Sequence, residues 1–198
     1  TNTTFKMTGG TISGNVSTSS TGGVHFLRSK GVLSGGTISN NESQTGHGGG
    51  IYLQGASVQL IGTYVGYNKA LKGNGGGVTT GQATVKKNGV VTEKYQCDLL
   101  LGGSVIEHNE AKNGGGVILQ SKTVMNVYNG RFLNNEAKGD GGAVYVKEGC
   151  TFNLYGGKLT GNGPKTTTSA AAGATVFLRS YYKGGATFNM YGGEISGN

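Results

Sequence analysis

The chain has 198 residues, of which 41 are glycine and only 34% are hydrophobic, a fraction lower than a single globular core of this length would need. Its formal charge of +8 is scattered from Lys6 to Lys183, without the basic cluster and interleaved aromatic residues that are typical of nucleic-acid binding. We therefore expect no nucleic-acid partner, and no membrane insertion either, because no apolar run approaches the roughly 20 residues of a membrane helix.

Seven copies of a short unit, each ending in asparagine, organise the chain. Within a copy the apolar residues lie two positions apart and then five further on, as in Phe152, Leu154 and Leu159. Alternation by two is the period of a β-strand. Between copies lies a second motif, usually Gly-Gly followed by an apolar residue, so one repeat is expected to hold three short strands. The final asparagines, at intervals of 26, 27, 41, 26, 27 and 36 residues, are Asn15, Asn41, Asn68, Asn109, Asn135, Asn162 and Asn198.

A fixed-period repeat buries the apolar face of its strands by stacking each turn on the next. The pattern therefore predicts an all-β fold, a parallel β-helix of six to seven turns with about 26–27 residues per turn. Successive turns would lie ~4.8 Å apart. One interior column would contain Phe5, Val58, Leu99, Met125, Phe152 and Phe188, and the neighbouring column would contain Met7, Leu33, Leu60 and Leu101.

The repeated asparagines predict a structural ladder. Asparagine tolerates the left-handed backbone conformation of a sharp turn, and stacked side-chain amides can form hydrogen bonds up and down a column. A binding role is the alternative, but only a turn requirement predicts one asparagine in every turn.

The two long intervals indicate insertions into a single β-helix domain that spans residues 1–198 and is expected to be a fragment of a longer protein. Residues 82–96 place two β-prone runs around Asn88-Gly89, a strong hairpin signal. This hairpin would be either a recognition finger or a tolerated surface insertion. Residues 163–172 are small and polar and are expected to form a loop. Further turns of the parent protein are expected to pack against both ends, because open β-helix ends expose unpaired backbone.

The closest copies of the two motifs are Phe132-Leu-Asn-Asn135 and Gly141-Gly-Ala-Val144. A unit that ends in apolar-x-x-Asn and is followed by Gly-Gly-apolar resembles the repeats of the polymorphic outer-membrane protein family of bacterial adhesins. More broadly, the whole chain resembles the pectate-lyase-like superfamily of right-handed parallel β-helices. These resemblances imply a right-handed helix and a secreted or cell-surface bacterial protein.

Tyrosine and asparagine recur at outward-facing positions of the later copies. Tyrosine rings and amides at strand spacing can form a flat platform for sugar rings and their hydroxyl groups. The alternative is a pair of cross-strand ladders that only stabilise the sheet. The residues of this possible glycan platform are Tyr128, Tyr155, Tyr191, Asn126, Asn153 and Asn189.

No catalytic, cofactor or metal site is predicted. Glu42, Glu110 and Glu136 each follow a ladder asparagine, but a carboxylate repeated at a turn indicates solvated surface rather than a glycosidase pair. Asp98 and Asp140 lie too far apart in register to hold the calcium of a β-helix lyase. The three histidines, at positions 25, 47 and 108, share no ligand spacing, and two cysteines are too few for a zinc site.

Cys97 and Cys150 are expected to lie two turns apart in one column, with Thr123 between them. Two turns place their Cα atoms near 10 Å apart, beyond the ~7 Å limit for a disulfide, so the column predicts two free thiols.

Together these patterns favour a non-catalytic β-helix segment of a secreted or cell-surface bacterial protein, an adhesin or glycan-contacting module. Its partner would be a host or environmental glycan or a surface protein. The alternative is part of a polysaccharide-active enzyme, a lyase or glycoside hydrolase, whose catalytic turns lie outside this segment.

Overall fold

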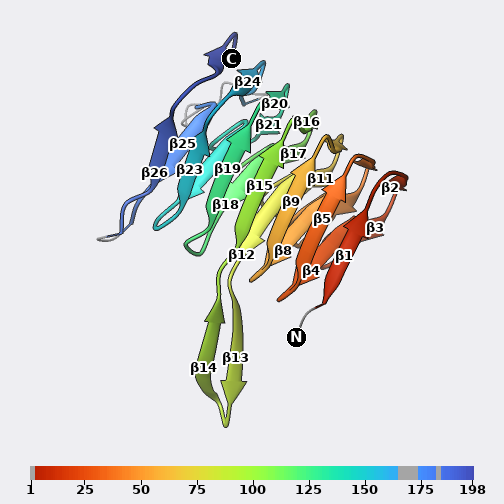
Figure 1. Cartoon of the computed structure of the whole chain (residues 1–198), viewed down its shortest axis with the longest axis vertical. Coiled ribbons are helices and arrows are strands. Elements are labelled where there is room, and N and C mark those ends of the chain that lie inside the picture. The colour runs from red at the N-terminus through yellow and green to blue at the C-terminus, as the bar shows by residue number, and fades with distance from the viewer. Residues whose placement is uncertain (1–2, 165–173, 182–183) are drawn as a thin grey trace.

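The computed structural model describes residues 3–164, 174–181 and 184–198. Within these residues the chain forms β-strands and no helix. The described residues therefore include no helix that is long and apolar enough to cross a membrane. Figure 1 shows successive turns lying side by side in chain order, so that the two termini are at opposite ends of the row.

In the described residues the strands form four parallel sheets and one hairpin. Sheet A contains β1 (Thr4–Met7), β5 (Lys30–Ser34), β9 (Ser57–Ile61), β15 (Asp98–Gly102), β19 (Val124–Tyr128), β23 (Thr151–Leu154) and β26 (Thr187–Met190). Sheet B contains β2 (Thr11–Ser13), β6 (Thr37–Ser39), β10 (Tyr64–Gly66), β16 (Val105–Glu107), β20 (Gly130–Leu133), β24 (Gly157–Thr160) and β27 (Glu194–Ser196).

The two remaining parallel sheets complete each turn. Sheet C contains β3 (Val16–Ser17), β7 (Glu42–Ser43), β11 (Lys69–Ala70), β17 (Glu110–Ala111) and β21 (Glu136–Ala137). Sheet D contains β4 (Val24–Leu27), β8 (Ile51–Gln54), β12 (Val78–Gly81), β18 (Val117–Leu119), β22 (Val144–Lys147) and β25 (Val176–Arg179).

This arrangement is consistent with the right-handed parallel β-helix that the sequence indicates. A complete turn carries one strand more than the three expected, because sheet C adds a strand of two residues directly after the ladder asparagine. Two residues are too few to show the alternation that identifies a strand in a sequence.

The interior columns of sheet A follow the predicted register. Phe152 pairs with Met125 on one side and with Phe188 on the other, and Leu101 pairs with Leu60 in the neighbouring column. Phe152 and Leu101 are both completely buried. Gly31 is the one member of the first column without a side chain, and a Cβ there would lie 2.7 Å from the ring of Phe26, which fills the space instead.

In the middle strands of sheet D the outward residues Thr79, Ile118 and Tyr145 are also buried, because the glycine-rich turn before each strand folds back over them. At Gly114 the backbone has φ +62°, and a Cβ would lie 2.8 Å from that of Ile118. Gly141 has φ +69° and would similarly meet Tyr145 at 2.9 Å. The left-handed conformation and the close approach both require glycine. The middle of sheet D therefore has little free outer surface, whereas the outward residues of sheet A are exposed or half-buried along all of its strands.

Candidate functional site

Tyr128, Tyr155 and Tyr191 form a tyrosine column on the outer side of sheet A. The rings of Tyr128 and Tyr155 stack with centroids 4.6 Å apart and planes 4° from parallel, and those of Tyr155 and Tyr191 stack at 4.9 Å and 9°. The backbone sets this spacing, because the Tyr155 N–H donates to the carbonyl of Val127 at 2.9 Å and the Tyr191 N–H donates to that of Leu154 at 2.8 Å.

The stacking determines which part of each ring can meet a ligand. Both faces of Tyr155 are covered by its neighbours, yet its side chain is 41% exposed, so the exposed part is the ring edge and hydroxyl. Burial raises the pKa of Tyr155, and the adjacent Tyr128 and Tyr191 raise it further. The phenol therefore stays neutral at physiological pH and can both donate and accept hydrogen bonds. The column ends at Tyr128, because its partner on β15 is Gly102.

Asn126, Asn153 and Asn189 form an outer asparagine column beside the tyrosines. Asn153 Nδ2 donates to Asn126 Oδ1 at 2.9 Å, and Asn189 Nδ2 donates to Asn153 Oδ1 at 2.8 Å. All three side chains are half-buried. Each amide has more hydrogen-bonding groups than this single chain of bonds uses, so the column retains capacity for an external partner.

The seven repeat asparagines form an inner asparagine ladder that follows the strands of sheet B. Asn109 is typical: its Oδ1 accepts from the N–H and Nδ2 of Asn68, both at 3.0 Å, and its own Nδ2 donates to Asn135 Oδ1 and to the Val65 carbonyl, both at 3.0 Å. Asn109 is completely buried. Equivalent bonds connect Asn15, Asn41, Asn68, Asn109, Asn135, Asn162 and Asn198.

The left-handed turn conformation, which the sequence placed at the ladder asparagine, lies one residue earlier. None of the ladder asparagines has a positive φ among the described residues; the residue before each one does, as in Asn40 (φ 55°), His108 (φ 50°) and Asn134 (φ 52°). The turn thus bends one position earlier than expected. The ladder asparagine is required for its amide, because that group satisfies backbone and side-chain partners in a buried corner.

Residues 82–96 form the hairpin that the Asn-Gly pair predicts. β13 (Ala83–Lys87) and β14 (Val90–Tyr95) pair antiparallel, with a bulge after Val85. Asn88 and Gly89 both have positive φ, as this tight turn requires. Figure 1 shows the hairpin projecting away from the stacked turns. Of the second predicted insertion, 163–172, residues 165–172 lie outside the described part of the chain.

One of the repeated glutamates, Glu110, belongs to a surface ion network. Glu110 lies next to Glu136 in sheet C, and its carboxylate is 3.1 Å from Lys138 Nζ and 3.8 Å from Lys69 Nζ. Both lysine side chains are about half exposed, at 54% and 52%. This pairing accounts for Glu110 as part of the solvated surface, the interpretation made from its repetition.

The two cysteines are buried free thiols in one column with Thr123. Cys97 Sγ lies 3.3 and 3.2 Å from the carbonyl oxygens of Leu53 and Gly81, either of which can accept its single S–H. Burial raises the pKa of the Cys150 thiol, against smaller opposing effects of backbone N–H groups. Reactive cysteines are accessible to solvent, so these two buried thiols are packing residues. Among the described residues no three His, Cys, Asp or Glu side chains gather as metal ligands.

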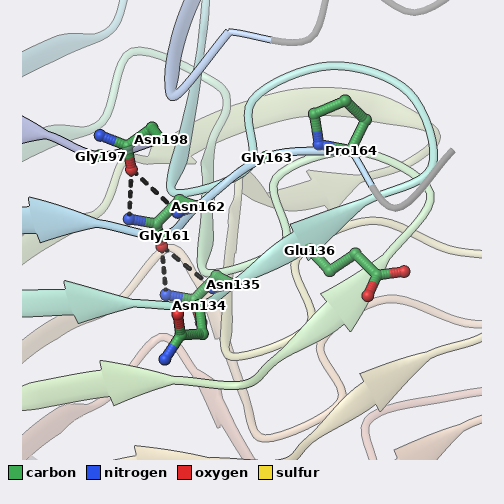
Figure 2. A pocket seen from close by; sticks show the side chains of 9 residues that line it. All are labelled: Asn134, Asn135, Glu136, Gly161, Asn162, Gly163, Pro164, Gly197 and Asn198. Atoms are coloured by element: carbon green, nitrogen blue, oxygen red, sulfur yellow. Dashed lines mark hydrogen bonds between the residues drawn. The ribbon is translucent and has the colours of Figure 1, made fainter. Parts of the chain in front are cut away.

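Figure 2 shows a cavity of about 360 Å³ at the end of the inner asparagine ladder nearest the C-terminus. Asn135, Asn162 and Asn198 lie along one side of it and are bonded to one another, while Glu136 extends on the other side. The amides are already used by the ladder. Its lining includes Pro164, the last described residue before 165–173, so the cavity supports no functional assignment.

A second cavity, of about 220 Å³, lies at the base of the hairpin and was not expected from the sequence. Arg28 and Lys30 line it together with Tyr95 and Gln96. We refer to it as the corner cavity, because it lies where sheet D passes into sheet A. Sequence reasoning treated the basic residues as a diffuse field, since nothing in the spacing of Arg28 places it near Tyr95.

Comparison with known proteins adds one match. Residues 129–147 match the family model of the Chlamydia polymorphic membrane protein repeat. This stretch contains Phe132–Asn135 and Gly141–Val144, the motif copies on which the resemblance rests. No curated protein matches the chain, and no solved structure does. The match supports the repeat resemblance over less than one turn, and the broader resemblance to pectate-lyase-like helices stays a prediction.

Proposed function

We propose that this chain is a non-catalytic, adhesin-like segment of a bacterial cell-surface β-helix protein, and that the outer side of sheet A contacts saccharides. The observation that carries the proposal is the tyrosine column with the outer asparagine column beside it, three residues of each type held at strand spacing on an exposed surface. The match of residues 129–147 to a bacterial membrane-protein repeat supports the cell-surface part.

The contact would use hydroxyl groups and amides rather than ring faces. Tyr155 lies between two other tyrosine rings, so a sugar cannot stack on it. The phenol hydroxyls and the amides of Asn126, Asn153 and Asn189 form two parallel rows of hydrogen-bonding groups. Saccharide hydroxyls both donate and accept, and a rigid row of such groups recognises them without the cost of ordering side chains on binding.

A triple variant tests this contact without disturbing the stack. Tyr128→Phe, Tyr155→Phe and Tyr191→Phe together remove the three hydroxyls and keep the rings. On an array of neutral oligosaccharides, we expect retention by the native chain and roughly tenfold or greater loss for the variant, equivalent to about 1.4 kcal/mol. Thermal unfolding of the variant should match that of the native protein.

Tyr67→Phe is the matched control. Tyr67 is also an exposed tyrosine, 47% exposed and stacked at 4.8 Å on His108, but it lies outside the tyrosine column. Its variant should bind like the native chain. An array that retains nothing, or a triple variant with an unchanged profile, would show that the column only stabilises the sheet. The surface location is tested separately with antibodies against the hairpin. They should bind intact bacterial cells that produce the protein.

A further inference from the structure

The corner cavity lies where three successive turns meet the base of the hairpin. Its lining comes from the sheet D to sheet A connection of the first turn (28–30), from the same connection of the second turn (55–57), and from Tyr95 and Gln96 at the end of the hairpin. Because the hairpin is inserted at this connection in the third turn, its base forms a wall beside the two preceding turns.

The position of this wall is determined by Gly55. Gly55 has φ +59°, and a Cβ there would lie 2.6 Å from Tyr95 Cβ and 2.7 Å from Ala83 Cβ. Only glycine allows both hairpin strands to approach the corner so closely. The Glu93 carboxylate accepts a hydrogen bond from the Tyr95 hydroxyl, which fixes the ring further. Close packing on Gly55 and this hydrogen bond therefore hold the Tyr95 wall in place against the stacked turns.

Two cations line the cavity without a counter-charge. Arg28 adopts a left-handed conformation with φ 46°, its N–H donates to the Gln54 carbonyl at 2.9 Å, and its guanidinium carbon lies 6.0 Å from the centre of the Tyr95 ring. Lys30 begins the next strand. Neither Arg28 nor Lys30 forms an ion pair within the described residues, and no carboxylate is among the residues that line the cavity.

The lining is suited to a small anion carried by a polyhydroxylated ligand. Arginine presents paired N–H groups to carboxylate, sulfate or phosphate oxygens, and a lysine adds a point charge. Ser29, Ser57 and Gln96 supply neutral donors and acceptors beside these cations. The volume of 220 Å³ is below the ~300 Å³ at which ordinary small-molecule pockets begin, so the cavity would hold one charged group of a longer ligand.

We infer that the corner cavity is a binding site for the carboxylate or sulfate group of an acidic saccharide, formed by Arg28, Lys30 and the Tyr95 wall. This site is separate from the tyrosine column and does not depend on it. An acidic sugar chain fits better than nucleic acid, because the cavity holds two cations and one aromatic residue rather than an extended basic stripe with stacking platforms.

Calorimetric titration of the full chain with three probes tests the inference. A heparin-derived hexasaccharide presents sulfate and carboxylate groups, oligogalacturonate presents carboxylates alone, and cellohexaose is neutral. We expect tighter binding of one or both acidic probes than of cellohexaose. The acidic probe that binds identifies the preferred group. Absence of binding to both acidic probes would overturn the inference, as would tighter binding of a poly-glutamate peptide than of either sugar.

The double variant Arg28→Asn/Lys30→Gln removes both charges and should fold, because asparagine tolerates the left-handed conformation of position 28. We expect its dissociation constant for the acidic probe to rise about tenfold or more. Lys86→Gln/Lys87→Gln, at the exposed far end of the hairpin, removes the same charge and should change binding less than about twofold.

Equal losses in the two double variants would show that the +8 field of the chain attracts the probe without a site. The tyrosine-to-phenylalanine triple variant should bind the acidic probe like the native chain. The two proposals therefore fail independently: the triple variant tests the tyrosine column, and Arg28→Asn/Lys30→Gln tests the corner cavity.

Discussion

Two columns of asparagine run along the same stacked turns and differ in what they must satisfy. In the inner ladder, Asn109 is completely buried and makes four side-chain hydrogen bonds within 3.0 Å. In the outer column, Asn153 is half-buried and makes two, one to each neighbouring asparagine. The residue type and the spacing are the same, so the difference lies in the surroundings.

This difference in burial decides which repeated asparagine is available for function. A buried amide cannot exchange its partners for a ligand without leaving backbone groups unpaired, at a cost of about 1–3 kcal/mol for each group. An outer amide can, because water already competes for it. Regularity alone therefore does not separate structural from functional repeats; burial and backbone partners do.

The largest expected effect is that of Asn109→Ala. The change leaves the buried Asn68 N–H without its partner, and it removes one hydrogen bond each from Asn68 Nδ2, the Val65 carbonyl and Asn135 Oδ1. Four lost hydrogen bonds and one unpaired buried N–H, partly relieved by water entry, should lower the free energy of unfolding by about 2–4 kcal/mol. Denaturant titration followed by circular dichroism measures it. A loss below about 1 kcal/mol would mean that the inner ladder is no more constrained than the outer column.

Gly115→Ala tests whether the backbone around the inner ladder can move. A Cβ at Gly115 would lie 2.4 Å from the carbonyl oxygen of Glu136, the residue that follows ladder residue Asn135. The strand after the ladder must then shift, and overpacking of this kind costs about 1–3 kcal/mol.

Gly103→Ala provides the control for that substitution. Gly103 has φ +60° and open space around it, so only backbone strain of about 1 kcal/mol applies. Thermal unfolding of the two variants should place Gly115→Ala below Gly103→Ala. The reverse order would show that the turns around the ladder tolerate displacement.

The sequence predicted the interior columns well, because a column needs only a constant period and alternation by two. The pairing of Leu101 with Leu60 and the stacking of Phe152 between Met125 and Phe188 follow from those two rules. The same rules place Tyr128, Tyr155 and Tyr191 in one row but do not say whether neighbouring rings stack or splay, which depends on side-chain rotamers.

The remaining features depend on three-dimensional contacts that periodicity does not encode. The strands of sheet C are too short to show a pattern. The burial of Ile118 and Tyr145 comes from glycine turns that fold back over sheet D. The corner cavity joins Arg28 to Tyr95 through the packing of the hairpin on Gly55, and no repeat rule connects an insertion to a turn two repeats earlier.

Asn153→Ala should have a much smaller effect than Asn109→Ala. It removes the bonds to Asn126 and Asn189 at a position that water can reach. Cross-strand pairs of this kind contribute about 0.2–1 kcal/mol, so the unfolding free energy should fall by no more than that. Retention of the variant on the oligosaccharide array should fall as well if the outer column contacts sugar. A stability loss equal to that of Asn109→Ala would remove the distinction between the columns.

The smallest expected effect is on pH dependence, because amide ladders carry no titrating proton. His47 provides a local exception: burial lowers its pKa below the ordinary value of 6.5, and the charge of Lys147 lowers it further. Above pH 6.5 the imidazole is neutral in both states. As the pH falls through 6.5 toward the lower folded value, the unfolded chain binds the proton first, so stability is lost.

The imidazole Nδ1 accepts from the Asn74 N–H at 3.3 Å, a bond that protonation removes. Since the imidazole is only partly buried and still reaches solvent, screening limits the loss to less than about 0.5 kcal/mol. Denaturation midpoints at pH 7.5 and 5.0 should therefore differ more for the native chain than for His47→Asn, whereas a wider gap in the variant would assign the acid sensitivity to other groups.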